Sequence, residues 1–372
     1  MRLPTIGSVL MALLAGCTQE TTPRAVPSPE GRPEPTAHTP PSPPAADPER
    51  MSTPRLLAFV DASTGWAGVG GEILATTDGG RSWVETFSAP GGIRWLDFAD
   101  AMHGWALLLD PEQRPGTLLR TVDGRTWTKL EGPPTPLVSI DFVSAQDGYG
   151  IQTDGSVVRT SDGATSWEQV TAFDADSLCA DGTAVWATQG RVAYRLTPEE
   201  GASGVFAAPL PGDGWVGGIA CAGETAWLLL QGGGAANQQA YAVFRTVDGG
   251  RTWDPVIAQF PASGSYYPFG DVTQTIDAYS GPFVAVDEQT AQFVGSCPAC
   301  DLGTVSLLTT PDGGRTWRRS HVIDRGFPLA VSFADRTHGW ILVSGDAGPG
   351  TVILATSDGG ATWRRQYETV PD

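Results

Sequence analysis

Short apolar runs and polar turns alternate along the chain from residue 55 to residue 372. In LLAFVDASTGW, which ends at Trp66, an apolar run is followed by a polar turn and a Gly-Trp pair. Related segments end at Trp105, Tyr149, Trp186, Trp227, Phe293 and Trp340. Because these runs are short and carry no period of about 3.6 residues, they predict β-strands rather than helices.

A second motif follows each of these segments, and its first copy is TTDGGRSW at Thr76–Trp83. Gly accepts positive φ and Asp accepts hydrogen bonds from nearby N–H groups, so the motif predicts a tight turn between two strands. The acidic residues at its centre are Asp78, Asp123, Asp162, Glu199, Asp248, Asp312 and Asp358; the copy around Glu199 is degenerate and lacks the final Trp. Their mean spacing of about 47 residues is the length of one propeller blade.

Together the two motifs predict the architecture. Each repeat is read as strand, turn, strand, loop, strand, tight turn and strand. Seven such four-stranded units predict an all-β fold, a seven-bladed β-propeller over residues 55–372. The first unit starts with its innermost strand and the last ends with RRQYETV, so every blade can be contiguous in sequence.

The tight-turn motif resembles the Asp-box, S/T-x-D-x-G-x-T-W, of bacterial neuraminidases, sortilin-type receptors and the photosystem II assembly-factor family. In those families the box is a folding device outside the active site, so the resemblance implies a structural role for every copy. Over residues 55–372 the repeats are similar to the photosystem II assembly/stability-factor family. That resemblance implies a seven-bladed lumenal or periplasmic protein that binds a partner without catalysis.

The N-terminus carries an export signal. Residues 1–16 contain a basic Arg2 and an apolar run too short to span a bilayer, which is typical of a signal peptide. The run ends in Leu-Ala-Gly before Cys17, which resembles the lipobox of bacterial lipoproteins and implies lipidation of Cys17. The alternative is an ordinary signal peptide with a spare cysteine. We expect a protein anchored by lipid to a membrane of the bacterial cell envelope and facing outside the cytoplasm.

Residues 17–54 are predicted to be a disordered linker. They are rich in Pro, Ser, Thr and Glu and contain almost no large apolar residue, so they cannot bury a core. The domain organisation is then a signal peptide at 1–16, a lipidated cysteine with its linker at 17–54, and the propeller.

Charge limits the partners. The formal net charge is −18 and the sequence pI is about 4.5, which argues against nucleic acid and against direct docking of the propeller on anionic lipid. We expect contact with the membrane through the anchor alone, and a protein or glycan partner. No motif for a cofactor or a metal ion is present, and none is predicted.

Four cysteines remain for the propeller, an even number typical of an exported protein. Counting back from the aromatic residues, Cys179 and Cys221 fall where other repeats have Phe, so we predict a disulfide between neighbouring blades. Cys297 and Cys300 form a C-x-x-C, which we interpret as a disulfide within a loop. Redox chemistry would need a helix N-terminus, and zinc a second pair of ligands.

An enzyme is the alternative. No G-x-S-x-G, H-E-x-x-H or phosphate-binding loop occurs. His103 and His338 occupy equivalent turns and are interpreted as turn residues. Asp97 and Asp141 are the only paired carboxylates that would suit a neuraminidase-type glycoside hydrolase.

The binding hypothesis follows from loop length. Loops of variable length all fall on one predicted face, which in repeat folds is commonly the binding face. Trp95 and Trp215 are the two tryptophans outside both motifs and lie at that face. We hypothesise a site made of Arg55, Arg94, Trp95, Trp215, Tyr266 and Tyr267, with Arg325 at its edge. In the alternative, both tryptophans plug the ends of blade interfaces, the tyrosines fold their loop onto the propeller, and the arginines are solvated.

Overall fold

The structure is a computed structural model. It describes residues 55–171, 173–182, 184–197, 201–210, 214–235, 238–260, 277–297, 303–344 and 350–369. The chain divides into two compact units, Met1–Pro44 and Ala45–Asp372, and all described residues belong to the second unit. The predicted signal peptide, Cys17 and the linker therefore lie outside the described residues.

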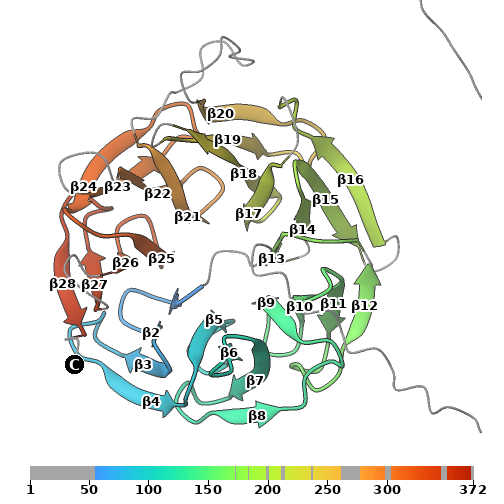
Figure 1. Cartoon of the computed structure of the whole chain (residues 1–372), viewed down its shortest axis with the longest axis vertical. Coiled ribbons are helices and arrows are strands. Elements are labelled where there is room, and N and C mark those ends of the chain that lie inside the picture. The colour runs from blue at the N-terminus through green and yellow to red at the C-terminus, as the bar shows by residue number, and fades with distance from the viewer. Residues whose placement is uncertain are drawn as a thin grey trace, which may run out of the picture. The chain divides into compact units, whose positions relative to one another are not determined.

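Seven antiparallel four-stranded sheets form a ring, and each consists of four consecutive strands (Figure 1). Blades I and II contain β1 (Leu57–Phe59), β2 (Gly65–Val69), β3 (Glu72–Thr76), β4 (Val84–Ser88), β5 (Gly92–Phe98), β6 (Gly104–Leu109), β7 (Pro115–Thr121) and β8 (Thr128–Leu130). Blades III and IV contain β9 (Leu137–Phe142), β10 (Gly148–Gln152), β11 (Val157–Thr160), β12 (Glu168–Thr171), β13 (Ser177–Asp181), β14 (Ala184–Gln189), β15 (Val192–Thr197) and β16 (Gly201–Ala207).

Blades V to VII complete the ring. Their strands are β17 (Val216–Ala222), β18 (Thr225–Ala235), β19 (Gln238–Thr246), β20 (Asp254–Gln259), β21 (Tyr279–Ala285), β22 (Ala291–Cys297), β23 (Thr304–Thr310), β24 (Arg318–Ile323), β25 (Pro328–Phe333), β26 (Gly339–Ser344), β27 (Thr351–Thr356) and β28 (Arg364–Glu368). The predicted all-β, seven-bladed propeller is confirmed. The described residues contain no helix, and hence none that could cross a membrane.

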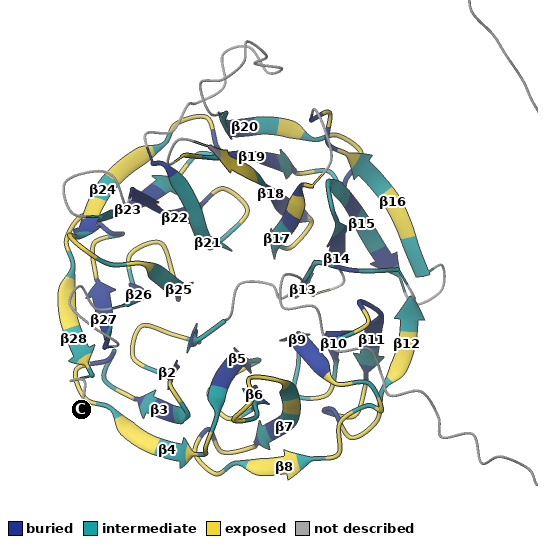
Figure 2. Cartoon of the chain, in the orientation of Figure 1, coloured by how far each residue is buried: buried dark blue, intermediate teal, exposed yellow. Residues whose placement is uncertain are grey.

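Burial changes from the second strand of each blade to the rim. All residues of β2 and β10 are buried, whereas the outermost strands β4, β8 and β12 have none buried (Figure 2). The aromatic residue of each second strand therefore belongs to the core, as its place in the repeat predicts. Trp105, Trp186 and Trp227 are fully buried.

Aromatic stacking joins neighbouring blades. The ring of Trp66 in blade I stacks on Phe98 in blade II with centroids 3.6 Å apart, and Trp105 in blade II stacks on Phe142 in blade III at 3.5 Å. Trp127, at the end of the tight-turn motif, packs edge-on against Phe98. The two motifs therefore meet in one cluster at each of these joints, which explains why they recur together.

The ring closes by packing between blades I and VII, without exchange of a strand. Phe59 stacks on Trp340 at 3.5 Å, and its N–H donates to the hydroxyl of Ser332 at 3.1 Å. Trp340 Nε1 donates to the carbonyl of Gly79 at 3.1 Å. Closure therefore repeats the contacts made between blades elsewhere in the ring.

The tight turns, here called DG loops, share one hydrogen-bond pattern. In the first, the Thr76 hydroxyl accepts the Gly80 N–H, while Asp78 accepts the N–H and the hydroxyl of Ser82. Gly79 and Gly80 adopt positive φ of 75° and 87°, which a Cβ would strain. The same pattern surrounds Asp162, Asp248, Asp312 and Asp358, and a loop one residue shorter surrounds Asp123. Glu199 lies outside the described residues.

Candidate functional site

Carboxylates near the ends of two innermost strands link neighbouring blades. Asp97 Oδ2 on β5 accepts the N–H of Phe142 in the next blade at 2.6 Å. Asp141 Oδ2 on β9 accepts the N–H of Ala180 in blade IV at 2.8 Å. The Ser332 hydroxyl makes the corresponding link at ring closure. Polar side chains at one position of the repeat thus connect the innermost strands.

Arg55 precedes β1 but crosses to blade II. Its backbone forms a parallel bridge with Trp95, and its carbonyl accepts the N–H of Leu96 at 2.7 Å. Its Nη1 donates to Asp97 Oδ1 at 2.6 Å and to Asp141 Oδ1 at 3.1 Å, and its guanidinium carbon lies 5.4 Å from the centroid of the Trp95 ring. We call Arg55, Asp97 and Asp141 the inner cluster; it ties the start of the propeller to blades II and III.

The inner cluster is largely withdrawn from water. The side chains of Asp97 and Asp141 are 8% and 10% exposed, and that of Arg55 is 36% exposed. Burial raises the pKa of Asp97 to about 7; Arg55 opposes this rise and the charge of Asp141 adds to it. Burial acts to lower the pKa of Arg55, but the two carboxylates outweigh it and raise that pKa overall. The two carboxylates therefore hold Arg55 in its charged form.

The hydrogen bonds of the inner cluster show whether Asp97 and Asp141 are available as the carboxylate pair of a hydrolase. The structure brings Asp97 and Asp141 together, since both accept from the same Nη1 of Arg55. Each of their four carboxylate oxygens already accepts a hydrogen bond from the protein. The arrangement is that of a structural clamp, with no carboxylate oxygen left without a donor.

The predicted disulfide between Cys179 and Cys221 is present, with Cα atoms 6.0 Å apart, and it joins blades IV and V. Cys221 lies opposite Ala226, as Phe142 lies opposite Gly148, so its predicted position in the repeat is correct.

The predicted position of Cys179 is wrong by one residue. Cys179 lies opposite Trp186, as Asp141 lies opposite Tyr149, so it occupies the carboxylate position rather than the Phe position. The reason is a turn in blade IV that is one residue shorter, which shifts any count made from the aromatic residue. The disulfide therefore stands where blades III and IV have the link from Asp141 to the N–H of Ala180.

The two tryptophans of the hypothesised site are buried. Trp95 and Trp215 are each 8% exposed and belong to hydrophobic clusters of the core. The Trp215 ring packs against Phe260 at 6.2 Å, and a Cβ on Gly232 would lie 2.9 Å from it. Neither ring offers a stacking surface to a partner, and the alternative, that both fill blade interfaces, describes their positions.

The other members of the hypothesised site are spread out. Arg55 contacts Trp95, as described, and Arg94 is buried, which lowers the pKa of its guanidinium. Arg325 is exposed in the connection between β24 and β25, at the joint of blades VI and VII. Tyr266 and Tyr267 lie outside the described residues.

Arginines at equivalent positions of the third strands stack over tryptophans of the second strands, an arrangement that was not predicted. On the third strand of blade V, Arg245 lies opposite Trp227 with its guanidinium carbon 5.0 Å from the ring centroid. In blade IV, Arg195 stacks over Trp186 in the same way, at 5.6 Å. The sequence holds a signal for this arrangement, since Arg precedes the first Thr of several tight-turn motifs, as in Arg245-Thr246. The equivalence of these arginines follows from the strand register, which the spacing of residues in the sequence does not give.

Within the described ranges, no group of three or more His, Cys, Asp or Glu could hold a metal ion. His103 and His338 each bond a turn aspartate three residues earlier, at 2.9 and 2.8 Å. Cys297 is disulfide-bonded, but Cys300 lies outside the described residues, so that pairing stays a prediction.

No protein-family model matches the sequence, and no curated protein matches it. Solved structures do match the fold. A structure of YCF48 bound to D1 peptide superposes with a TM-score of 0.57 at 17% identity, covering 82% of this chain and 93% of that one. YCF48 from Cyanidioschyzon merolae gives 0.57 at 15% identity, covering 82% and 96%.

A glycoside hydrolase also matches. The GH74 xyloglucanase from Xanthomonas campestris gives a TM-score of 0.53 at 16% identity, covering 86% of this chain and 61% of the enzyme. At such identities these likenesses establish the propeller fold alone. The propeller fold that the predicted resemblance implies is shared with the two YCF48 structures.

Proposed function

We propose that this chain is a lipid-anchored propeller of the bacterial cell envelope, facing outside the cytoplasm, that binds a protein or glycan partner without catalysing a reaction. In this proposal the DG loops, including the copy around Glu199, are Asp-boxes that serve folding. Lipidation of Cys17 anchors the chain, and residues 18–54 are the linker to the propeller.

The observation that carries this proposal is the likeness to YCF48 bound to D1 peptide, which extends over 93% of that chain. A protein of similar fold takes a peptide partner there, so a protein partner is the first choice here. The fold does not identify the partner, because functions are grafted on folds through their sites.

The inner cluster supports binding over hydrolysis. A glycosidase needs one carboxylic acid to protonate the leaving group and one carboxylate free to attack or to activate water. The oxygens of Asp97 and Asp141 instead accept two backbone N–H groups and the guanidinium of Arg55. Loss of this cluster would disturb three blades, which suits a structural role.

The partner surface in this proposal is the face on which the chain enters each innermost strand. Arg325 is exposed on that face, and Arg125 is exposed on the opposite face in a DG loop. We expect Arg325→Ala to weaken capture of the partner from native envelopes several-fold, and Arg125→Ala to leave it unchanged. Equal capture by both variants, with both folded, would remove this face from the proposal.

The anchor has a separate test. Cys17→Ser should move the protein from the membrane fraction to the soluble extracytoplasmic fraction, because a chain without acyl groups has no apolar anchor. Unchanged membrane retention would contradict lipidation. Turnover of a sialoside or a glycan panel by the purified chain would instead favour the neuraminidase-type alternative.

A further inference from the structure

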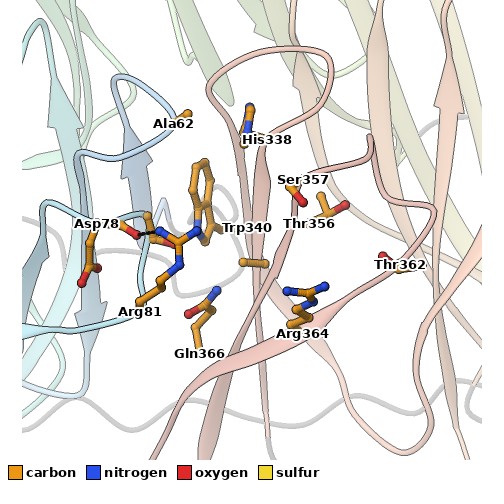
Figure 3. Close-up of a pocket in the computed structure, with 12 residues that line it drawn as sticks. Ala62, Asp78, Arg81, His338, Trp340, Thr356, Ser357, Thr362, Arg364 and Gln366 are labelled. Atoms are coloured by element: carbon orange, nitrogen blue, oxygen red, sulfur yellow. Dashed lines mark hydrogen bonds between the residues drawn. The ribbon is translucent and has the colours of Figure 1, made fainter.

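A pocket of about 140 Å³ opens at the joint of blades VII and I, on the side of the DG loops. Its lining includes Trp340, Ala355 and Ala62 (Figure 3). Arg81 and Arg364 approach it from opposite sides. At about 30 Å³ for each water molecule, the space is roughly that of four or five waters. The space therefore takes one end group of a small solute, such as a guanidinium, while the rest of the solute lies at the open side of the pocket.

At the joint of blades V and VI, a side chain of the blade itself fills the corresponding place. There the strand register aligns Trp227, Arg245 and Asp254 across three neighbouring strands. The guanidinium of Arg245 lies over the Trp227 ring and donates to the carbonyls of Glu288 at 2.6 Å and Gly313 at 3.4 Å. A guanidinium balanced by a neighbouring carboxylate thus occupies that joint.

At the joint of blades VII and I the register aligns Trp340, Ala355 and Arg364. Ala355 replaces Arg245, so β27 brings no guanidinium over the tryptophan. Arg81 reaches the pocket from the DG loop, where its Nη1 donates to the carbonyl of Asp78 at 2.9 Å. Arg364 replaces Asp254, so the charge at the rim is reversed. Arg364 makes no side-chain hydrogen bond or ion pair with any other described residue.

The joint of blades VII and I still has backbone carbonyls that correspond to the two acceptors of Arg245. Gly79 corresponds to Gly313. The N–H of Gly79 donates to the carbonyl of Ser63 and that of Gly313 to the carbonyl of Gln289, and each acceptor lies in the turn between the first two strands of the same blade. The carbonyl of Gly79 accepts one bond, from Trp340 Nε1, and a carbonyl oxygen has two lone pairs. Ala62, which precedes Ser63, lines the pocket as the counterpart of Glu288.

We propose that this pocket binds a small zwitterion with a guanidinium or ammonium group at one end and a carboxylate at the other. The cationic end takes the place of Arg245 against the carbonyls of Gly79 and Ala62, and the carboxylate pairs with Arg364 and Arg81. A plain anion would face the two carbonyls, and a plain cation would face the two arginines. The Asp78 carboxylate beside the pocket is engaged by Ser82 and Thr76 within its own loop.

Isothermal titration of the full chain at fixed ionic strength tests this site with three probes. L-Arginine carries both ends, agmatine lacks the carboxylate, and succinate lacks the cation. We expect saturable binding of one L-arginine, and binding of agmatine and of succinate at least tenfold weaker. Absence of L-arginine binding at millimolar concentration, or equal binding of agmatine, would overturn the proposal.

Two variants and a control place the binding in the pocket. Ala355→Arg supplies the guanidinium from the chain itself and should abolish L-arginine binding. Arg364→Asp recreates the rim of the blade V–VI joint and should weaken L-arginine while strengthening agmatine. Arg365→Asp, the neighbouring residue whose guanidinium pairs with Glu368 at 3.0 Å, should bind L-arginine as the parent does. Unchanged L-arginine binding in both folded pocket variants would refute the site.

Discussion

The joints on either side of blade IV use one position of the repeat in different ways. Between blades III and IV, the Asp141 carboxylate accepts the N–H of Ala180, whereas between blades IV and V a covalent bond joins Cys179 to Cys221. The strand register makes Asp141 equivalent to Cys179. The first link is a hydrogen bond to a carboxylate, and the second is a covalent bond between two sulfur atoms. The comparison teaches that the repeat fixes the place of a link and leaves its chemistry free.

The largest expected effect comes from removing the covalent link. Cys179→Ala with Cys221→Ala should lower the free energy of unfolding by about 4 kcal/mol, because the bond closes a loop with a sequence separation of 42 residues. Denaturant unfolding of the parent and the variant measures this difference. Equal stability of the two proteins would show that the native packing alone holds this joint.

Moving the bond sharpens the comparison. In the background lacking Cys179 and Cys221, Asp141→Cys with Ala180→Cys should form a disulfide between blades III and IV, since these positions are equivalent. We expect part of the lost stability to return under oxidising conditions, as measured by unfolding with and without reductant. Two free thiols by mass analysis would contradict the equivalence of the joints.

A smaller effect is expected from the carboxylate. Asp141→Ala leaves the Ala180 N–H without its acceptor and removes one partner of Arg55, which should cost about 1–3 kcal/mol. Glu131→Ala removes an exposed acidic side chain and is the matched control, expected to unfold as the parent does. A similar loss in both variants would mean that net charge, rather than the link, governs stability.

Stability should also depend on pH. The raised pKa of Asp97, about 7, means that the folded state binds an extra proton between about pH 4 and 7, so stability should rise as pH falls through this range. Hydrogen bonds from the hydroxyl and N–H of Ser82 lower the pKa of Asp78 to about 2, so its contribution is present above about pH 4 and lost as pH falls towards 2. Asp97→Asn should flatten the neutral limb of the unfolding profile. Asp78→Asn should only reduce the slope of the acid limb, because the aspartates of the other DG loops also have lowered pKa values.

Much of the fold was predictable because it is repeated. Each blade repeats the same pattern, so aligned copies predict the strand order, the tight turns and the cysteine pair. The prediction of a surface site at Trp95 and Trp215 rests on their place outside the repeat. In the structure that is where single side chains fill the irregular ends of blade interfaces. The crossing of Arg55 into blade II is a contact made once, by the segment before β1, and no periodic signal encodes it.

The contiguity of the blades also sets an order of assembly. Because no strand is borrowed from the other end of the chain, each sheet has all four strands as soon as its last one has been synthesised. Each blade can therefore pack onto the preceding blade, from the N-terminus onward, as neighbouring repeats do in repeat proteins. A chain that stops before β25 would carry six finished sheets with two uncovered flanks, and arrival of the seventh sheet covers both at once.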